Sequence, residues 1–421
     1  MKLELIVPPS PFLGDEKRSA PLSILYLAAV ARNQCEVKIN DLREKSQSLE
    51  VGDADIYGIT ATTPDYPAAK KIAEICKKKN PKAWIVLGGV HATALPNEID
   101  AIFGKLIVGE GEISLMEILK DYELGNNEKR IYSSEMIQDI DTIPFPARDL
   151  AEFDSVFSKN ALFSGDSEYA TTIMTSRGCF NNCSFCASDK MWHRKLRFRS
   201  AENVLDEIKE IKDKWGVRNL RFQDDTMTLN EERLKKLCAG MKALGIRWRV
   251  GTRVDKVNYE MLKMMKESGC DEVAYGIESL DQDVLNKNSK NIKIEDIDRA
   301  MRASKAAGMM IRAYFIIGLP REKPGFADRI ERFAKEYSPE AINIHTFVPF
   351  PGSPVYHNPE KYGIKLKDKD FSSYIMTLGL GKGELEQDFT FVHDVMSEEQ
   401  LKEERRKAIE FVRDMKLVKN Y

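Results

Sequence analysis

Three of the seven cysteines in this 421-residue chain fall within eight residues. Cys179, Cys183 and Cys186 follow one another with the spacing Cys-x3-Cys-x2-Cys, and Phe185 directly precedes the last of them. Soft thiolate ligands select iron–sulfur clusters, so three thiolates on one short loop predict a [4Fe–4S] cluster with one iron left open. A zinc site usually adds a fourth Cys or His; structural zinc and three buried thiols remain the alternatives.

Composition narrows the class of protein. The net charge of −2 gives no electrostatic reason for binding nucleic acid or an anionic membrane. No apolar run reaches the roughly 18 residues that a membrane span needs, and the run at 3–7 meets prolines too soon for a signal peptide. An odd number of cysteines in a large chain favours reduced thiols. We therefore expect a cytoplasmic protein of roughly two or three domains.

The cysteine loop resembles the defining motif of the radical S-adenosylmethionine (SAM) superfamily. This resemblance implies that the amino and carboxylate groups of SAM chelate the open iron, and that Phe185 packs near the adenine. It also implies a reductant such as a flavodoxin or ferredoxin as a partner.

The segment 169–350 alternates expected strands with helical periods, and Ser200 and Asn258 are candidate N-caps. Strands are expected at 171–175, 217–222, 247–250, 272–276, 311–317 and 341–346. Six strand–helix units predict a (β/α)6 partial barrel whose site lies at the carboxyl ends of the strands. The cysteine loop follows the first of these strands, as that geometry requires.

Most of the later strands end in a polar residue or a glycine, and these match SAM-binding positions of the family. The resemblance implies acidic groups near the methionine ammonium, Glu278 near the ribose or methionine, and Gly318 near the adenine. Asp224 replaces the usual Gly-Gly-Glu element of the family. Capping of 226–230 by the aspartates, a rim salt bridge at Glu278 and structural ion pairing at Arg253 are the alternatives. The candidate SAM contacts are Phe185, Asp224, Asp225, Arg253, Glu278, Ser279 and Gly318.

Three further strand residues are candidates for the inside of the barrel. Arg312 alternates with Ile311 and can face the lumen, and Tyr275 and Tyr314 can reach the active space, although strand tyrosines more often pack in a core. The sequence assigns no catalytic residue.

Residues 1–122 also alternate strand and helix. Strands are expected at 3–7, 37–39, 55–59, 84–87 and 106–108, with helices at 22–32 and 68–79. Short apolar strands alternating with helices predict a doubly wound parallel sheet, whose ligands bind beyond the carboxyl ends of the strands.

Four segments of this region, 22–28, 58–62, 87–93 and 108–112, together resemble the cobalamin-binding domain found ahead of many radical SAM enzymes. An empty structural sheet is the alternative. His91, the one histidine of the region, is expected near the nucleotide tail or corrin edge, or as an ordinary loop residue. The candidate cobalamin contacts are Thr60, Thr62, Thr63, Gly88, Gly89, His91, Gly109, Glu110 and Gly111.

One residue departs from the wider cobalamin-binding fold. That fold often carries Asp-x-His-x-x-Gly, in which the histidine ligates cobalt, whereas here Arg43 stands two residues after Asp41. The resemblance therefore implies base-off cobalamin without a histidine ligand.

The fold class that follows is α/β: a Rossmann-like cobalamin-binding domain (1–122), a linker (123–168), a radical SAM partial barrel (169–350) and a small, mostly helical C-terminal extension (351–421). The extension ends in an amphipathic helix that begins with a capping box at Ser397. Family chemistry implies a methyltransferase that acts on an unactivated carbon through a 5′-deoxyadenosyl radical and methylcobalamin. Cyclisation, ring contraction or rearrangement with the same cofactors, and a non-catalytic cobalamin or redox sensor, are the alternatives. A methylthiotransferase is disfavoured because residues 1–122 hold only Cys35 and Cys76 and lack a second cysteine triad.

Overall fold

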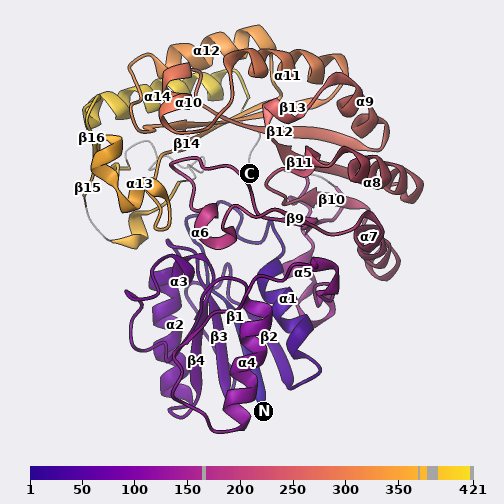
Figure 1. Ribbon diagram of the computed structural model, residues 1–421, viewed down its shortest axis with the longest axis vertical. Helices are drawn as coiled ribbons and strands as arrows, with labels where there is room; N and C mark the ends of the chain where they lie inside the picture. The colour runs from indigo at the N-terminus through magenta and orange to yellow at the C-terminus, as the bar shows by residue number, and fades with distance from the viewer. Residues whose placement is uncertain (164–166, 368–369, 377–386, 418–421) are drawn as a thin grey trace. The chain divides into compact units, whose positions relative to one another are not determined.

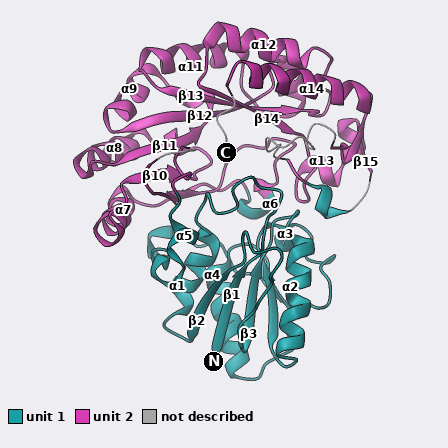
Figure 2. Ribbon diagram, turned by 180° about the vertical axis from the view of Figure 1, so that it is seen from behind, with its two compact units in different colours: residues 1–158, 190–193, 370–374 teal, residues 159–189, 194–369, 375–421 magenta. Residues whose placement is uncertain are grey.

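The computed structural model describes residues 1–163, 167–367, 370–376 and 387–417. It forms two compact units (Figure 2). Unit 1 comprises residues 1–158, 190–193 and 370–374, and unit 2 comprises 159–189, 194–369 and 375–421. Each unit contains a six-stranded parallel sheet.

Unit 1 is a doubly wound sheet with the strand order β2-β1-β3-β4-β5-β6. Helices α2 and α3 pack on one face and α1 and α4 on the other, so both faces are covered (Figure 1). This confirms the predicted architecture. The elements are β1 (Lys2–Val7), α1 (Leu22–Ala31), β2 (Glu36–Asp41), β3 (Ile56–Thr60), α2 (Tyr66–Lys79), β4 (Trp84–Gly88), α3 (Val90–Ala94), β5 (Lys105–Ile107), α4 (Gly111–Glu123) and β6 (Ile131–Tyr132).

The first sheet extends beyond residue 122, into the segment that the sequence assigned to a linker. The two residues of β6 pair with β5, and the fully buried Tyr132 donates its hydroxyl to Asp121 at 2.8 Å. A two-residue strand is too short to show an alternating pattern, which is why periodicity did not reveal it. The short helices α5 (Phe153–Val156) and α6 (Ser188–Trp192) also lie outside the predicted elements.

Unit 2 is an open sheet with the strand order β14-β13-β12-β11-β10-β7, and these six strands confirm the partial barrel. Ser200 and Asn258 accept backbone N–H groups as the predicted N-caps. The elements are β7 (Ala170–Ile173), β8 (Ser176–Arg177), β9 (Arg197–Phe198), α7 (Ala201–Trp215), β10 (Asn219–Phe222), α8 (Glu231–Leu244), β11 (Arg247–Thr252), α9 (Tyr259–Glu267), β12 (Cys270–Glu278), α10 (Gln282–Lys287), α11 (Ile294–Ala306), β13 (Met310–Ile317), α12 (Phe326–Tyr337) and β14 (Ala341–Thr346).

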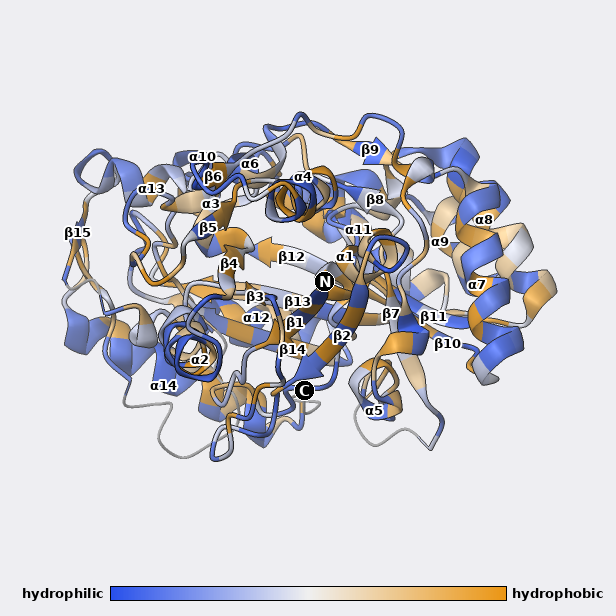
Figure 3. Cartoon of the chain, turned by 90° about the horizontal axis from the view of Figure 1, so that it is seen from below, coloured by the Kyte–Doolittle hydropathy of each residue, from blue (hydrophilic) through white to orange (hydrophobic). Residues whose placement is uncertain are grey.

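Alternation along the barrel strands separates the core from the lumen. Trp248 of β11 is fully buried; its ring packs edge-on against Phe222, and its indole N–H donates to the carbonyl of Ser268. Its neighbours Arg247 and Arg249 point to the other side of the sheet, since successive strand residues face opposite ways. The helices are also two-sided: Figure 3 shows hydrophobic and hydrophilic residues on different sides of helices such as α7 and α8.

The C-terminal extension continues unit 2. It contains α13 (Pro354–His357), the antiparallel pair β15 (Ile364–Leu366) and β16 (Phe391–His393), and α14 (Glu398–Asp414). The predicted capping box at Ser397 is present, and α14 packs against α12 and β14. Among the described residues, no helix is long and apolar enough to cross a membrane.

Candidate cofactor sites of the two units

The three cysteines lie on the loop between β8 and α6. Gly178, with φ +99°, turns the chain into this loop. The N–H of Cys186 donates to the carbonyl of Cys183 at 3.1 Å, which closes a turn between these two cysteines. Between them, Ser184 bonds Asn288 twice, through its N–H (2.9 Å) and its hydroxyl (2.8 Å). The loop is therefore anchored to the segment after α10.

Two of the sulfur atoms receive hydrogen bonds. Asn181 donates its side-chain amide to Cys179 at 3.3 Å, and the N–H of Ser188 donates to Cys186 at 3.4 Å. Burial raises the pKa of the Cys183 thiol and raises that of Cys186 to about 12. Binding of a metal must therefore displace protons from these thiols.

The donor set fits an iron–sulfur cluster. All seven cysteines are free thiols, and three of them share this loop. In the described parts of the chain, no three His, Cys, Asp or Glu side chains gather closely enough for a single metal ion. A [4Fe–4S] cluster takes each thiolate on a different iron, so its ligands need the wider spacing that a loop provides.

Asp224 supports the segment that leads into the cysteine loop. Its carboxylate accepts the N–H and hydroxyl of Thr175, at 3.2 and 2.7 Å, and the hydroxyl of Ser176. Burial raises the pKa of Asp224. The neighbouring Asp225 has neither of these hydroxyl partners, and burial together with the Asp224 charge raises its pKa to about 6. Asp225 is thus the better placed of the two to meet a ligand cation.

Glu278 ends β12 in an unusual backbone conformation. Its φ is +70°, at a break in the register with β13, and strain of this kind concentrates at functional sites. Gly276 makes the geometry possible, because a Cβ there would lie 2.6 Å from the Glu278 carboxylate. Lys290 holds that carboxylate at 2.8 Å, with both side chains largely buried.

The remaining SAM candidates also follow strand ends. Arg253 donates to Asp255 at 2.8 Å and to two carbonyls of the 290–291 segment, which is the structural pairing that the sequence left open. Ser279 is fully buried and accepts the N–H of residue 281. Gly318 adopts φ +83° beside two phenylalanines of the tail. Phe185 packs against a hydrophobic cluster that includes Leu319 and Phe391.

In unit 1, the cobalamin candidates gather beyond the carboxyl ends of the adjacent strands β3, β4 and β5. Gly89 has φ +96°, and a Cβ there would lie 2.7 Å from the carbonyl of Ala61. Thr93 links two of the turns, because its hydroxyl donates to the Gly89 carbonyl and accepts the N–H of Gly109. Gly109 has φ +85° and open space where a side chain would be. This edge therefore fits a bulky ligand that approaches the backbone closely.

His91 is enclosed within unit 1. It is 1% exposed, its Nδ1 lies 3.3 Å from the hydroxyl of Thr63, and its ring packs against Tyr66 and Phe371 at centroid distances of 4.3 and 4.8 Å. Burial lowers its pKa to about 4, so the ring is neutral. Thr62 and Glu110 are likewise held by protein groups, residue 65 and the N–H of residue 137.

Arg43 is committed to the fold. It pairs with Asp41 (Nη2–Oδ2 2.6 Å, Nε–Oδ1 2.9 Å) and donates to the carbonyls of Glu16, Ser19 and Ser155 at 2.7–3.0 Å. Both side chains of the ion pair are buried. A guanidinium has no lone pair to give to cobalt, so residue 43 cannot serve as a metal ligand.

Two family models match this chain, one in each of its two main parts. The radical SAM superfamily model matches residues 173–334, and the B12-binding domain model matches residues 16–119. The chain belongs to the radical SAM superfamily, among the members that carry a B12-binding domain.

Three relatives align with most of this chain. An uncharacterized methyltransferase of Pyrococcus horikoshii is 31% identical over 84% of this chain and 82% of its own length. The anaerobic magnesium-protoporphyrin IX monomethyl ester cyclase of Cereibacter sphaeroides is 29% identical over 79% of this chain and 56% of its own. Bacteriochlorophyllide d C-12(1)-methyltransferase of Chlorobaculum tepidum is 24% identical over 85% and 76%.

A solved structure shares the fold. The radical S-adenosylmethionine methyltransferase TsrM from Kitasatospora setae, solved with cobalamin and a [4Fe–4S] cluster, superposes with a TM-score of 0.71 at 16% identity, covering 98% of this chain and 88% of its own.

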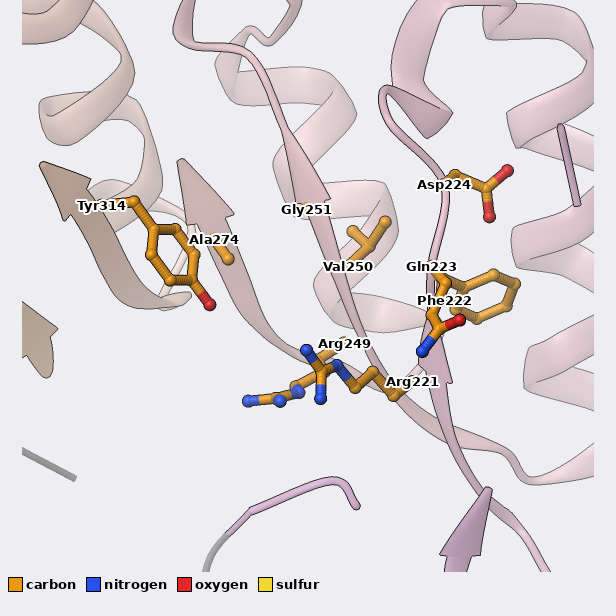
Figure 4. A pocket seen from close by; sticks show the side chains of 9 residues that line it. All are labelled: Arg221, Phe222, Gln223, Asp224, Arg249, Val250, Gly251, Ala274 and Tyr314. Carbon is orange, nitrogen blue, oxygen red and sulfur yellow. The ribbon is translucent and has the colours of Figure 1, made fainter. Parts of the chain in front are cut away.

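Two groups of residues in these sites were not predicted from the sequence. Tyr66 and Phe371 enclose His91, and the second of them comes from a segment about 280 residues further along the chain, which no local pattern reveals. Arg221 and Arg249 line a cavity in unit 2 (Figure 4). Charged residues at alternate positions of barrel strands were the available signal for this second group.

Proposed function

We propose that this protein is a cobalamin-dependent radical SAM methyltransferase that methylates an unactivated carbon. The observation that carries the proposal is that this one chain matches both a radical SAM model and a B12-binding model. The chain also aligns along most of its length with a relative named as a methyltransferase. When bound, the cluster, SAM and cobalamin supply a radical that abstracts hydrogen and a transferable methyl group.

In this proposal the protein's own residues position and shield these groups. Cys179, Cys183 and Cys186 hold the cluster, and Ser184 fixes their loop to the barrel. Asp225 and the strained Glu278 supply carboxylates for the ammonium and hydroxyl groups of SAM.

We further propose that cobalamin binds base-off, without a protein ligand to cobalt. Arg43 occupies the position of the usual histidine, and its guanidinium is held by six hydrogen bonds to protein. His91 is enclosed by Thr63 and two aromatic rings. Both observations support a cobalt without an imidazole ligand.

Electron paramagnetic resonance tests the cofactors directly. Protein reconstituted without oxygen with iron, sulfide and cobalamin and then partly reduced should show a [4Fe–4S]+ signal beside a cob(II)alamin signal without nitrogen splitting. Cys183→Ala should abolish the cluster signal, whereas Cys238→Ala, a buried cysteine on α8, should retain it. Nitrogen splitting that disappears in His91→Gln would refute the base-off proposal, and absence of bound cobalamin would refute the methyltransferase.

A second candidate is a cyclase that uses the same cofactors, favoured by the similarity to the Cereibacter sphaeroides enzyme. Mass spectrometry of the product separates the two, since methylation adds one CH2 and cyclisation does not. A failure to cleave SAM under reducing conditions would count against both and favour a sensor.

We propose a one-electron donor of the flavodoxin or ferredoxin type as the reductant. The exposure of the loop supports this, because Phe180 retains 45% of its surface. Reduced flavodoxin should generate the [4Fe–4S]+ signal within a single mixing experiment, and no signal in either donor's presence would refute the assignment.

A further inference from the structure

A cavity of about 370 Å³ lies within unit 2, lined by residues of the neighbouring strands β10 to β13. This volume suits a small organic molecule. Asp224, which supports the segment before the cysteine loop, contributes to its wall, so the cavity adjoins the candidate SAM site.

Small residues create the space. Gly251 and Ala274 are register partners in β11 and β12, and both line the cavity. The backbone does not require the glycine: its φ is not positive, and a Cβ at Gly251 would meet its nearest atom only at 3.9 Å. A larger side chain would therefore enter the cavity without disturbing the sheet.

Two arginines give the cavity its chemistry. In Figure 4 the guanidiniums of Arg221 and Arg249 lie close together, the hydroxyl of Tyr314 is directed toward the same region, and the carboxylate of Asp224 lies on the opposite side. In the part of the chain that the structure describes, the Tyr314 hydroxyl has no hydrogen bond, and the side-chain amide of Gln223 also lines the wall.

One of the two arginines, Arg249, is held in place before any ligand arrives. Arg249 is buried; its Nη1 donates to Glu272 at 3.1 Å, and its guanidinium lies 5.6 Å from the ring centre of Phe163. Glu272 is itself fixed by two hydrogen bonds from Arg312, at 2.9 and 3.0 Å. Preorganised donors lose little entropy on binding, so this network favours tight recognition of an acceptor.

We propose that this cavity binds an oxyanion of the substrate, a carboxylate or a phosphonate, through Arg221 and Arg249 with the Tyr314 hydroxyl as a further donor. Planar guanidiniums match such groups with paired hydrogen bonds. As a substrate site it rests on the proposed function. The substrate is then a small acid, and its anionic end is anchored inside the barrel.

Equilibrium dialysis of the cluster- and cobalamin-loaded protein tests the proposal without turnover. The probes are indole-3-acetate, its uncharged analogue indole-3-acetamide, and phenylphosphonate. We expect one of the two acids to bind about tenfold more tightly than the amide, because hydrogen bonds between ionised partners are stronger than those to a neutral amide. Which acid binds better distinguishes a planar from a tetrahedral oxyanion.

Three variants control the result. Arg221→Gln should abolish the preference for acid over amide, and Gly251→Val should fill the cavity and abolish binding of all three probes. Lys263→Gln, which removes an exposed charge on α9, should leave binding unchanged. All three should keep the cluster signal in electron paramagnetic resonance, which shows that they fold.

Three outcomes would overturn the proposal. These are equal affinity of the wild-type protein for both acids and the amide, an undiminished preference in Arg221→Gln, and competitive displacement of the acid by SAM, which would make the cavity part of the SAM site. Because dialysis requires no SAM cleavage, acid binding can be established even if the methyltransferase assay fails, and the converse also holds.

Discussion

Replacing Arg43 tests whether this buried residue stabilises unit 1 by joining separate segments of the chain. Its buried guanidinium balances Asp41 and satisfies the carbonyls of Glu16, Ser19 and Ser155, three points distant in sequence. Arg43→Met keeps much of the side-chain volume but leaves a buried carboxylate without its counterion. Breaking a buried pair in this way costs about 3–5 kcal/mol.

A double substitution separates the ion pair from the carbonyl contacts. In Asp41→Leu/Arg43→Met no uncompensated charge remains, so the loss should be about 1–3 kcal/mol smaller than the sum of the two single losses. The remaining loss then reports the three carbonyls. Equal losses in the double variant and in the sum would mean that the two side chains do not interact.

Hydrogen exchange resolved by peptide is the suitable assay, because it reports the opening free energy of β1 and β2 separately from unit 2. Arg32→Met is the matched control: Arg32 forms a bidentate pair with Asp149, but both side chains are more than a third exposed, so its loss should be about 0–1 kcal/mol. An Arg43→Met loss no larger than that of Arg32→Met would refute the reasoning.

Three further predictions concern stability. Burial lowers the pKa of His91 from 6.5 to about 4, so between these pH values the unfolded chain binds more protons than the folded chain. The free energy of unfolding should therefore fall by about 3 kcal/mol as the pH drops from 6.5 to 4. Thermal melting at several pH values should show this loss in the wild-type protein and little of it in His91→Gln. Gly269→Ala should cost about 2–4 kcal/mol in urea unfolding, because φ is +95° and the Cβ would lie 2.1 Å from the carbonyl of Ile246, whereas Gly308→Ala, with open space, should cost about 1 kcal/mol. Ser397→Ala should destabilise α14 by about 1 kcal/mol through loss of its N-cap, measured by exchange of the α14 amides; an unchanged rate would contradict this.

Local patterns were sufficient to predict the scaffold. The six barrel strands lie within a few residues of the expected ranges, because strands and helices alternate regularly along this segment. Asn258 illustrates this: a single side chain marks the start of α9 through its bond to the N–H of residue 261. The three cysteines of the loop could be grouped from the sequence alone, because they are close in sequence.

Contacts between segments that are distant in the chain could not be predicted from local sequence patterns. Nothing near Arg43 indicates that its partners would come from residues 16, 19 and 155. Gly251 and Ala274 resemble ordinary strand residues until the register of β11 and β12 places them side by side. Asp224 was predicted as a SAM contact, but only the fold shows that its carboxylate accepts a hydrogen bond from the Thr175 hydroxyl.

Arg43 and His91 together bear on the proposal of base-off cobalamin more strongly than either residue does alone. Arg43 has no lone pair to offer cobalt, and its buried ion pair and three carbonyl contacts hold it in place, since breaking such a pair costs about 3–5 kcal/mol. His91 is already neutral and thus chemically able to ligate, but doing so would require its ring to part from Thr63, Tyr66 and Phe371. The packing of Arg43 and His91 therefore supports the proposal that cobalamin bound at this edge takes no ligand from either residue.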